Sequence, residues 1–241
     1  MNYIRKRLIP VLLIENGRLI KTKNFKEPRY LGDPLNALRI FNEKCADEII
    51  IIDKSQGALN RKLLDRMVDE AFMPLSYIGG IKTFEDFETI FSLGIEKVGI
   101  RSLLFENISI VKQAVKKWGS SSIFAMLDYQ ADHNNKIYFS INSRKKIKDI
   151  NSVINNIKES EVGELVLQNI SREGTFLGLS ERLIKSFKGP VNIPIVVAGG
   201  ATSIDSSLQF ISKHDISGIA AGSLFSFYGP RKAVLINYDY E

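Results

Sequence analysis

The sequence predicts an α/β protein, a closed (β/α)8 TIM barrel built from two duplicated half-barrels. Short apolar runs without polar alternation recur along the chain, as expected for parallel strands that are covered on both faces. Short links join most of them to helical segments, which is the pattern of a parallel sheet with crossover helices. One apolar run, 193–198, leads into Gly199-Gly200, where the backbone comes close to a ligand and the next helix offers free N–H groups to an anion.

An internal repeat indicates how the barrel is divided. The stretch 73–82 matches 193–202 at an offset of 120 residues, and Arg101-Ser102 matches Gly222-Ser223 at an offset of 121. Chance similarity of two Gly-Gly turns is the alternative, but the proline before each turn and the serine after it also coincide. Because the offset is half of the 241 residues, we expect one domain over 1–241 with half-barrels at about 1–118 and 119–241.

The first half predicts four strands. The apolar run 8–14 leads through the hairpin-type turn 15–17 into 18–21. Asp33-Pro34 starts a helix that runs to about Cys45, because Asp caps a helix and Pro suits its first position. The other expected elements are a strand at 48–53, a helix from about 61 to 71, a strand before Gly79-Gly80, a helix opened by the capping-box-like stretch 83–86, and a strand at 97–100.

The second half repeats this order. A strand at 122–128 is followed by a polar hairpin-like segment with His133-Asn-Asn135, as the first strand was followed by its own hairpin. The other expected elements are a helix from 149 to about 160, a strand at 164–169, a loop at 172–175, strands at 195–198 and 219–221, and a short last helix near Tyr228-Gly-Pro230. Eight parallel strands imply a closed barrel whose loops after the strands carry the chemistry.

Composition restricts the class of protein. With 44% hydrophobic residues, the chain is large enough to bury a barrel-sized core. Its single cysteine, Cys45, forms no disulfide framework and predicts a cytoplasmic protein in a reducing compartment. The apolar run 8–14 is too short for a signal peptide or a membrane span.

The charge pattern favours a small anionic ligand. The net charge of +6 is spread along the chain and is not interleaved with aromatic residues, so nucleic-acid binding is not expected. His133 and His214 are the only histidines and have no Cys or carboxylate partners at ligand spacing. We therefore expect no metal site and no cofactor.

Two carboxylates end strands at the expected catalytic face. Asp128 ends the fifth predicted strand and Asp53 the second, where side chains converge and a carboxylate is a natural general acid or base. Either side chain alternatively binds loop backbone. The position that matches Asp128 in the first half is Leu13, which exchanges no proton.

These residues resemble the cyclase subunit family of imidazole glycerol phosphate synthase, an enzyme of histidine biosynthesis, over essentially the whole chain. The segments that carry the resemblance are 8–18, 79–81, 171–175, 195–201 and 221–223. In that family the barrel receives ammonia from a glutaminase subunit on the opposite face and uses it to split a bis-phosphorylated ribulosyl precursor and close an imidazole. The resemblance implies the same fold and a heterodimer with a glutaminase at the N-terminal face of the barrel.

The resemblance carries over unevenly at the catalytic end. The second catalytic aspartate of the family falls on Asp128, whereas the first falls on Leu13. The strand-two aspartate matches Asp53, and Arg101 stands where the family usually has Asn, which suggests a changed but still anionic ligand. An aspartate of the sixth loop is Glu173 here. The implied phosphate-binding residues are Gly80, Arg101 and Ser102 in one cradle and Gly174, Gly200, Gly222 and Ser223 in the other.

At the other end of the barrel the resemblance implies an intact ammonia gate. The family closes this end with a ring of four charged residues, which match Arg7, Glu48, Lys97 and Glu164. An ordinary solvated rim is the alternative. However, all four lie at strand starts beside apolar runs, where unpaired charges are costly and pairing is expected.

Three functions are compatible with this pattern. The preferred one is a divergent paralogue that transfers ammonia to another phosphorylated or sugar-nucleotide acceptor. The resemblance associates such paralogues with glycosyl amidation, which makes acetamidino sugars for surface polysaccharides. The second is the family reaction itself, with Asp53 or Glu15 replacing the missing carboxylate. The third is a non-catalytic barrel that binds and activates a glutaminase or a sugar-modifying partner.

Overall fold

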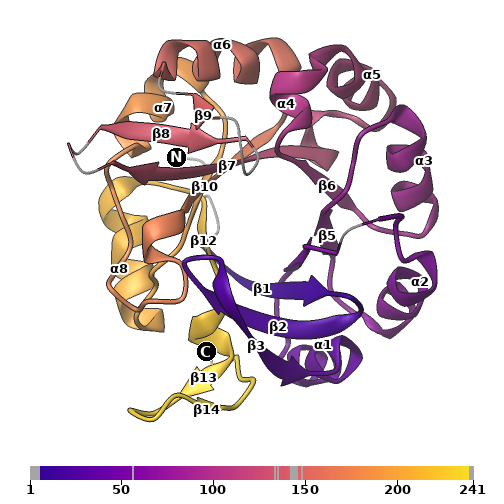
Figure 1. Cartoon of the computed structure of the whole chain (residues 1–241), viewed down its shortest axis with the longest axis vertical. Coiled ribbons are helices and arrows are strands. Elements are labelled where there is room, and N and C mark those ends of the chain that lie inside the picture. Colours follow the sequence, from indigo (N-terminus) through magenta and orange to yellow (C-terminus); the bar gives the residue numbers. More distant parts are fainter. Residues whose placement is uncertain are drawn as a thin grey trace.

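A computed structural model describes residues 6–55, 57–132, 134, 136–141, 146–147 and 149–238. Eight parallel strands close a barrel in the order β1-β4-β5-β6-β7-β10-β11-β12, and β12 pairs with β1 again. Helices surround the barrel on the outside (Figure 1). The predicted (β/α)8 barrel is therefore confirmed. The barrel strands are β1 (Arg7–Glu15), β4 (Ile49–Asp53), β5 (Leu75–Ile78), β6 (Lys97–Ile100), β7 (Ile123–Ala131), β10 (Glu164–Asn169), β11 (Ile195–Ala198) and β12 (Gly218–Ala221).

The helices begin where the sequence offers caps. Asp33 accepts a hydrogen bond from Leu35 N with Pro34 next to it, and Thr83 and Ser203 each form a capping box. The outer helices are α1 (Pro34–Glu43), α2 (Arg61–Glu70), α3 (Phe84–Ser92), α4 (Leu103–Glu106), α5 (Ile108–Trp118), α6 (Ile150–Ser160), α7 (Ile184–Val191) and α8 (Ile204–His214). No helix within the described ranges combines the length and apolar character needed to cross a membrane.

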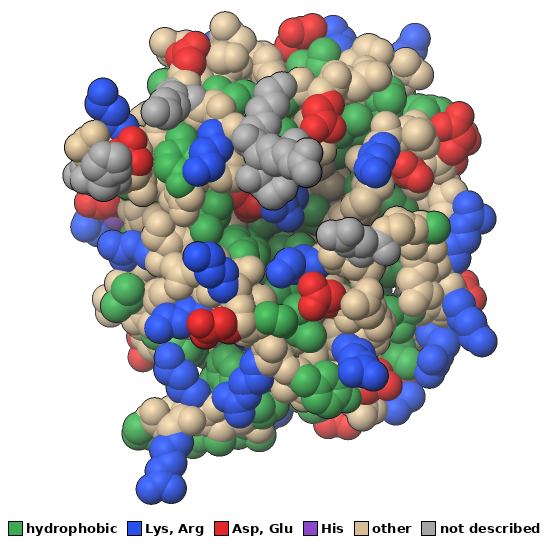
Figure 2. Space-filling model, in the orientation of Figure 1, with side chains coloured by type: hydrophobic (Ala, Val, Ile, Leu, Met, Phe, Trp, Pro, Cys, Tyr) green, Lys and Arg blue, Asp and Glu red, His purple; other side chains and the backbone are tan. Residues whose placement is uncertain are grey.

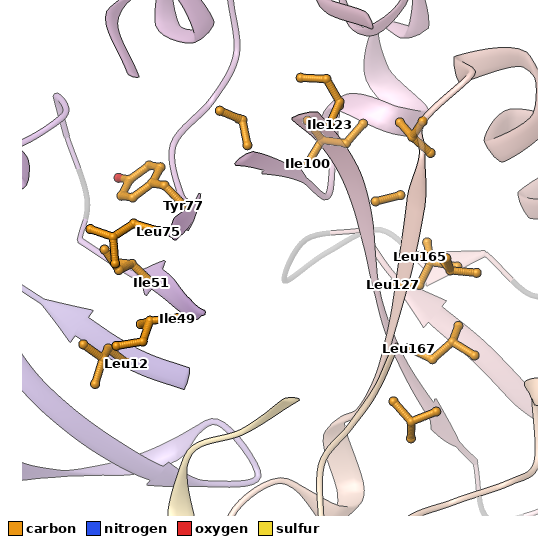
Figure 3. Packing of buried hydrophobic residues seen from close by; sticks show 14 of the residues in the cluster. Leu12, Ile49, Ile51, Leu75, Tyr77, Ile100, Ile123, Leu127, Leu165 and Leu167 are labelled. Atoms are coloured by element: carbon orange, nitrogen blue, oxygen red, sulfur yellow. The ribbon is translucent and has the colours of Figure 1, made fainter. Parts of the chain in front are cut away.

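Alternation along the strands builds two cores. Leu12, Ile51 and Leu167 point outward against the helices (Figure 3), whereas their strand neighbours Leu13 and Ile52 point into the barrel. The barrel interior is filled by apolar side chains, among them Ile9, Ile50, Phe124, Met126, Val166 and Val196. Burying each such side chain contributes about 1.5–3 kcal/mol.

Two hairpins rise from the carboxyl ends of β1 and β7. The turn at Asn16-Gly17 joins β1 to β2 (Arg18–Lys23), as predicted, and β3 (Lys26–Gly32) extends this hairpin beyond the prediction. β7 continues into β8 (Ile137–Ser140), and β9 (Lys146–Ile147) pairs with it. His133 and Asn135 of the predicted second hairpin lie outside the described residues. Because β2 and β8 come after matching strands, the hairpins give the two halves a similar outline, and the duplication itself stays a prediction.

The segment after β12 differs from the short last helix expected from the sequence. Within 222–238 the chain forms a 3-10 turn (Ser223–Phe225) and the hairpin of β13 (Phe227–Tyr228) and β14 (Ala233–Val234). Tyr238 then packs against Phe41 and Phe225, and its hydroxyl donates to Leu8 O at 3.0 Å. Gly229, at a φ of 71°, and the turn at 229–232 favour a hairpin over a helix. The buried Tyr238 covers β1 where the sequence predicted a short last helix.

Candidate functional site

The candidate site lies on the face where the barrel strands end. This face, marked by the β1–β2 and β7–β8 hairpins, is turned toward the viewer in Figure 1. The space-filling view shows a hollow at its centre, with Lys and Arg side chains along its border (Figure 2). The hollow and its positive border suit an anionic ligand.

Leu13 and Asp128 hold matching places in the barrel. Leu13 pairs with Ile52 on β4, and Asp128 pairs with Gln168 on β10. In both cases the paired residue is the last but one of its strand. Leu13 is 2% exposed and belongs to the inner apolar cluster, so the position that matches Asp128 holds no group able to transfer a proton.

Asp128 is buried and paired with a cation. It is 4% exposed, and Arg101 Nη2, at the end of β6, forms an ion pair with Asp128 Oδ2. Burial raises the pKa of the Asp128 carboxyl above its ordinary value, although the charge of Arg101 acts in the opposite direction. Among the described residues, Asp128 Oδ1 has no hydrogen-bond partner. Asp128 is thus a buried carboxyl group with one oxygen paired and the other without a partner among the described residues.

Asp53 is engaged by its own surroundings. Ser55 N donates to Asp53 Oδ1 at 2.8 Å, and the Tyr77 hydroxyl donates to Asp53 Oδ2 at 3.2 Å. Burial, followed by the Asp53 charge, raises the pKa of Tyr77. A Cβ on Gly79 would lie 2.6 Å from Asp53 O, so the first Gly-Gly turn is packed directly on this strand end. This arrangement fits the structural alternative for Asp53, namely binding of loop backbone.

The second predicted cradle borders a cavity that opens to solvent between β10, β11, β12 and β1. The cavity is lined by Leu13 and by all four residues predicted there: Gly174, Gly200, Gly222 and Ser223. Gly200 has a φ of 99°, and a Cβ there would lie 2.3 Å from Gly178 O. Ser203, three residues further on, caps α8. A glycine is therefore required where this turn packs against Gly178, close to the N-terminus of α8.

A buried ion pair inside this cavity was not predicted from the sequence. Lys21, 7% exposed, places its Nζ 3.4 Å from Glu173 Oε1. Glu173 also accepts hydrogen bonds from the Thr22 hydroxyl at 3.0 Å and from Phe25 N at 2.9 Å. Burial lowers the pKa of Lys21, with Glu173 opposing that effect. The signal in the sequence was a lysine directly after the apolar pair Leu19-Ile20 of a hairpin strand.

Two further polar groups of the site lack partners in the described part of the chain. Gln168 Nε2 and Ser223 Oγ form no hydrogen bond there, although both side chains are at most 8% exposed. Both residues line the cavity at the second cradle. Because buried polar groups are normally paired, two unpaired groups on one cavity wall fit a polar ligand. Gln168 was also missed by sequence reasoning.

The first predicted cradle lies across the mouth. Gly80, Arg101 and Ser102 line a separate open depression beside Lys82 and Asp53. Gly80 has a φ of 63°, and a Cβ there would meet no atom within 4 Å, so the space above the turn is open. The structure thus brings the three predicted residues together, with Asp128 on β7 between this cradle and β10.

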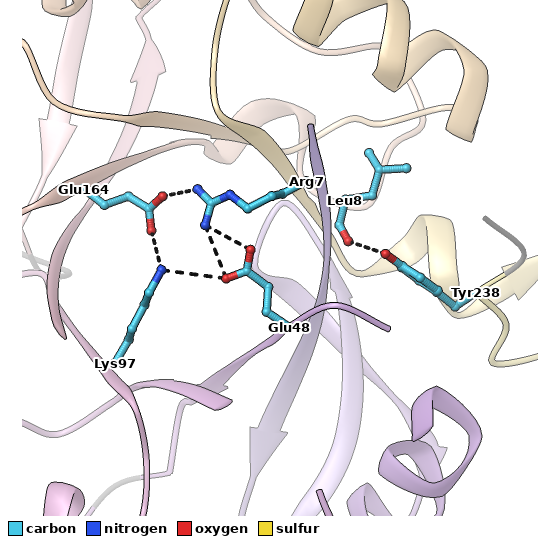
Figure 4. Close-up of polar contacts among 6 residues, drawn as sticks. All are labelled: Arg7, Leu8, Glu48, Lys97, Glu164 and Tyr238. Carbon is cyan, nitrogen blue, oxygen red and sulfur yellow. Dashed lines mark hydrogen bonds and ion pairs between the residues drawn. The ribbon is translucent and has the colours of Figure 1, made fainter. Parts of the chain in front are cut away.

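At the opposite end, the four predicted gate residues form a closed ring (Figure 4). Arg7 Nη1 lies 3.0 Å from Glu48 Oε1, and Arg7 Nη2 pairs with Glu164 Oε1. Lys97 Nζ lies 3.3 Å from Glu164 Oε2 and 3.9 Å from Glu48 Oε2. The side chains are 11–29% exposed, which is more buried than in an ordinary solvated rim.

Burial and pairing oppose each other in the ring. Burial, together with repulsion from Glu164, raises the pKa of Glu48 above its ordinary value, although Arg7 and Lys97 lower it. For Arg7, burial lowers the pKa, but Glu164 and Glu48 together outweigh it and raise it. Each charge therefore depends on its neighbours, and the loss of one leaves another uncompensated.

Comparison with known proteins gives one matching family. Residues 7–230 match the family described as "Histidine biosynthesis protein". A relative from Pseudomonas aeruginosa, provisionally named imidazole glycerol phosphate synthase subunit hisF2, is 38% identical over 98% of this chain and 96% of its own. A Vibrio vulnificus relative, provisionally named subunit hisF3, is 41% identical over 98% and 93%. The imidazole glycerol phosphate synthase subunit HisF of Lactococcus lactis is 28% identical over 93% and 89%.

Proposed function

The chain belongs to the histidine biosynthesis protein family, among the cyclase subunits of imidazole glycerol phosphate synthase, and from that premise we propose a divergent function for it. In this proposal the barrel is an ammonia-transferring synthase or lyase-type subunit that works in a complex with a glutaminase. Its acceptor is a phosphorylated or sugar-nucleotide compound, as in the synthesis of acetamidino sugars for surface polysaccharides.

The contrast between the two barrel ends carries the proposal. The Arg7–Glu48–Lys97–Glu164 ring is closed by ion pairs at one end, whereas at the other end Leu13 occupies the place that matches Asp128. Four part-buried charges cost desolvation energy, and a barrel without any function would gain nothing from keeping them paired. This supports retained ammonia handling with altered acceptor chemistry.

The interior between the two ends suits neutral ammonia. Ile9, Ile50, Phe124 and Met126 fill it with apolar side chains, and an ammonium ion would lose its hydration there at a high cost. We propose that the glutaminase docks over the ring on the N-terminal face, that ammonia enters between the four charges, and that it reaches the mouth beside Asp128.

At the mouth, each group has a proposed role. Asp128 is the general acid or base, and its raised pKa brings it closer to neutral pH. The two cradles hold phosphate groups, with Lys21 close to the second. Gln168 and Ser223 provide the remaining polar contacts. Asp53, whose two oxygens both accept hydrogen bonds, orients the Tyr77 side chain.

The family reaction itself is the second candidate, because the relatives carry that name. It requires another carboxylate in place of Leu13. Glu15 lines a different surface depression beside Arg18 and Tyr30, and Asp53 borders the other cradle, so neither shares the cavity of Leu13. A non-catalytic barrel is the third candidate, and the unpaired polar groups on the cavity wall argue against it.

Reconstitution tests the proposal. The protein is combined with a glutaminase encoded beside its gene and supplied with glutamine labelled with ¹⁵N in the side-chain amide. Sugar nucleotides and the ribulosyl precursor of histidine synthesis are then offered separately, and products are read by mass spectrometry. We expect the label in a sugar-nucleotide product; label only in an imidazole product would establish the family reaction, and label in neither would favour a non-catalytic barrel.

A further inference from the structure

Arg101 contacts a buried carboxylate and also lines a candidate anion site. Its guanidinium is paired with the buried Asp128 carboxylate, and the same side chain lines the first cradle with Gly80 and Ser102. The Arg101 side chain is 35% exposed, so unlike Asp128 it has room to move. One cation thus serves both a fixed internal anion and the wall of an open depression.

Two observations indicate that the pair between Arg101 and Asp128 leaves hydrogen-bonding capacity unused. Asp128 Oδ1 and Gln168 Nε2, which lie on paired residues of β7 and β10, have no hydrogen-bond partner among the described residues. Arg101 donates to Oδ2 alone, so its contact with the carboxylate is not bidentate. A guanidinium binds a phosphate-type anion through two parallel hydrogen bonds, so such an anion in the cradle competes well for it.

We propose that Arg101 couples anion binding in the first cradle to the state of Asp128. In the free protein the guanidinium favours the charged form of Asp128 and opposes the effect of burial. A phosphate-type anion beside Gly80 draws the guanidinium away, and the carboxylate, now buried without its cation, takes up a proton readily. Arg101 is thereby a specificity-determining residue, because an acceptor without an anionic group at this position leaves Asp128 paired.

This inference rests on the proposed function, since it uses Asp128 as the acid or base and the first cradle as an anion site. It adds an order of events: the anion binds first and the proton-transferring group is released second. With this coupling, Asp128 is released for proton transfer only when an anionic acceptor occupies the first cradle. The enzyme then selects acceptors by the contacts that they make with Arg101.

The test measures the Asp128 carboxyl directly by ¹³C NMR in the full chain labelled in its aspartate carboxyls, with Asp128→Asn to assign the signal. Inorganic sulfate is the probe because its charge is constant across the titration, and chloride at equal ionic strength controls for screening. Sulfate binding is followed in parallel by thermal protection. The matched variants are Arg101→Asn and Arg101→Lys.

We expect saturating sulfate to make Asp128 bind its proton at least about tenfold more tightly in the natural protein, because a close cation is withdrawn from a buried carboxylate. In Arg101→Asn, Asp128 should bind its proton more tightly even without sulfate, and added sulfate should change this proton affinity little. Sulfate itself should bind to this variant about tenfold more weakly. Arg101→Lys should retain part of the response.

Three outcomes would overturn the inference. Equal responses in natural protein and Arg101→Asn would mean that the anion acts through space. Thermal protection without any change at Asp128 would place the anion in the other cradle only, which leaves the proposed function standing. Absence of protection by sulfate in every protein would remove the anion sites, and the proposed function would fall with the inference.

Discussion

Leu13 on β1 and Asp128 on β7 are counterparts: each pairs with the last residue but one of the next parallel strand, Ile52 and Gln168 respectively. One counterpart is a buried apolar side chain and the other a buried carboxylate. This single asymmetry separates the protein from a barrel with two acids at its mouth. It also makes the role of Asp128 the first prediction.

Asp128→Asn should abolish product formation, with a loss of about 10²–10⁴-fold, because the amide has the same shape but transfers no proton. The fold should survive, since the partner left behind, Arg101, reaches water. Turnover in the reconstituted complex and the urea midpoint of the barrel provide the two readings. A fully active Asp128→Asn protein would remove Asp128 from the chemistry.

Gly200→Ala should damage the second cradle. The Cβ would lie 2.3 Å from Gly178 O, and φ is 99°, so we expect a loss of about 1–3 kcal/mol in the free energy of unfolding together with loss of protection by phosphate. Gly189→Ala in α7 is the control: apart from its two chain neighbours, no atom lies within 4 Å of the added Cβ, so we expect a smaller loss than at Gly200, limited to crowding against the following Pro190. Equal effects of the two substitutions would argue against a built cradle.

The ring should couple glutamine use to product formation. Glu164→Gln removes the carboxylate that pairs with both Arg7 and Lys97. We expect glutamine-dependent turnover to fall by about tenfold or more while turnover with added ammonium changes much less, because free ammonium reaches the mouth from solution. Glu181→Gln, which removes the exposed carboxylate that pairs with Lys213, is the control with the same change in charge. A parallel fall in both activities would indicate a general structural role for the ring.

Glu48 predicts a pH dependence of stability. Because burial raises its pKa in the folded protein, the folded state binds the proton more tightly than the unfolded state. The stability contributed by Glu48 is then fully present below its unfolded pKa and is lost as pH rises through the folded pKa. The natural protein should therefore gain stability relative to Glu48→Gln as pH falls from about 7 to about 5. A relative loss in urea titrations would show that Arg7 and Lys97 dominate instead.

Tyr238 should matter more than its place near the chain end suggests. Its hydroxyl donates to Leu8 O at 3.0 Å, and its ring packs on Phe41 and Phe225. We expect Tyr238→Phe to cost about 1 kcal/mol of unfolding free energy and Tyr238→Ala about 3–5 kcal/mol. Tyr228→Ala, at an exposed ring on the same tail, should cost little. Denaturant unfolding of the three variants checks this closure of the barrel.

The fold was largely predictable because it depends on local signals. Apolar runs, the caps Asp33 and Thr83, and the turn at Asn16-Gly17 each determine one element, and the strand count then implies a barrel. The tail at 222–238 was not predictable in this way. Its structure depends on a tertiary contact, the burial of Tyr238 against β1. No local sequence pattern predicts this contact.

The site was predictable by residue but not by pairing. The resemblance placed Arg101 and Asp128 at the mouth, but the sequence did not show that they form an ion pair, because β6 and β7 contribute them separately. Lys21 was missed for a related reason. It lies on a hairpin strand, and its burial depends on a contact with Glu173 in the loop after β10.

The central claim is that Leu13 has moved this barrel away from the histidine-pathway reaction. The most direct measurement is turnover of the ribulosyl precursor by the purified natural protein at high ammonium concentration and raised pH, with Leu13→Asp and Leu13→Asn alongside and folding checked for each. We predict no turnover by the natural protein and by Leu13→Asn. Clear turnover by the natural protein would contradict the account and establish a working cyclase subunit.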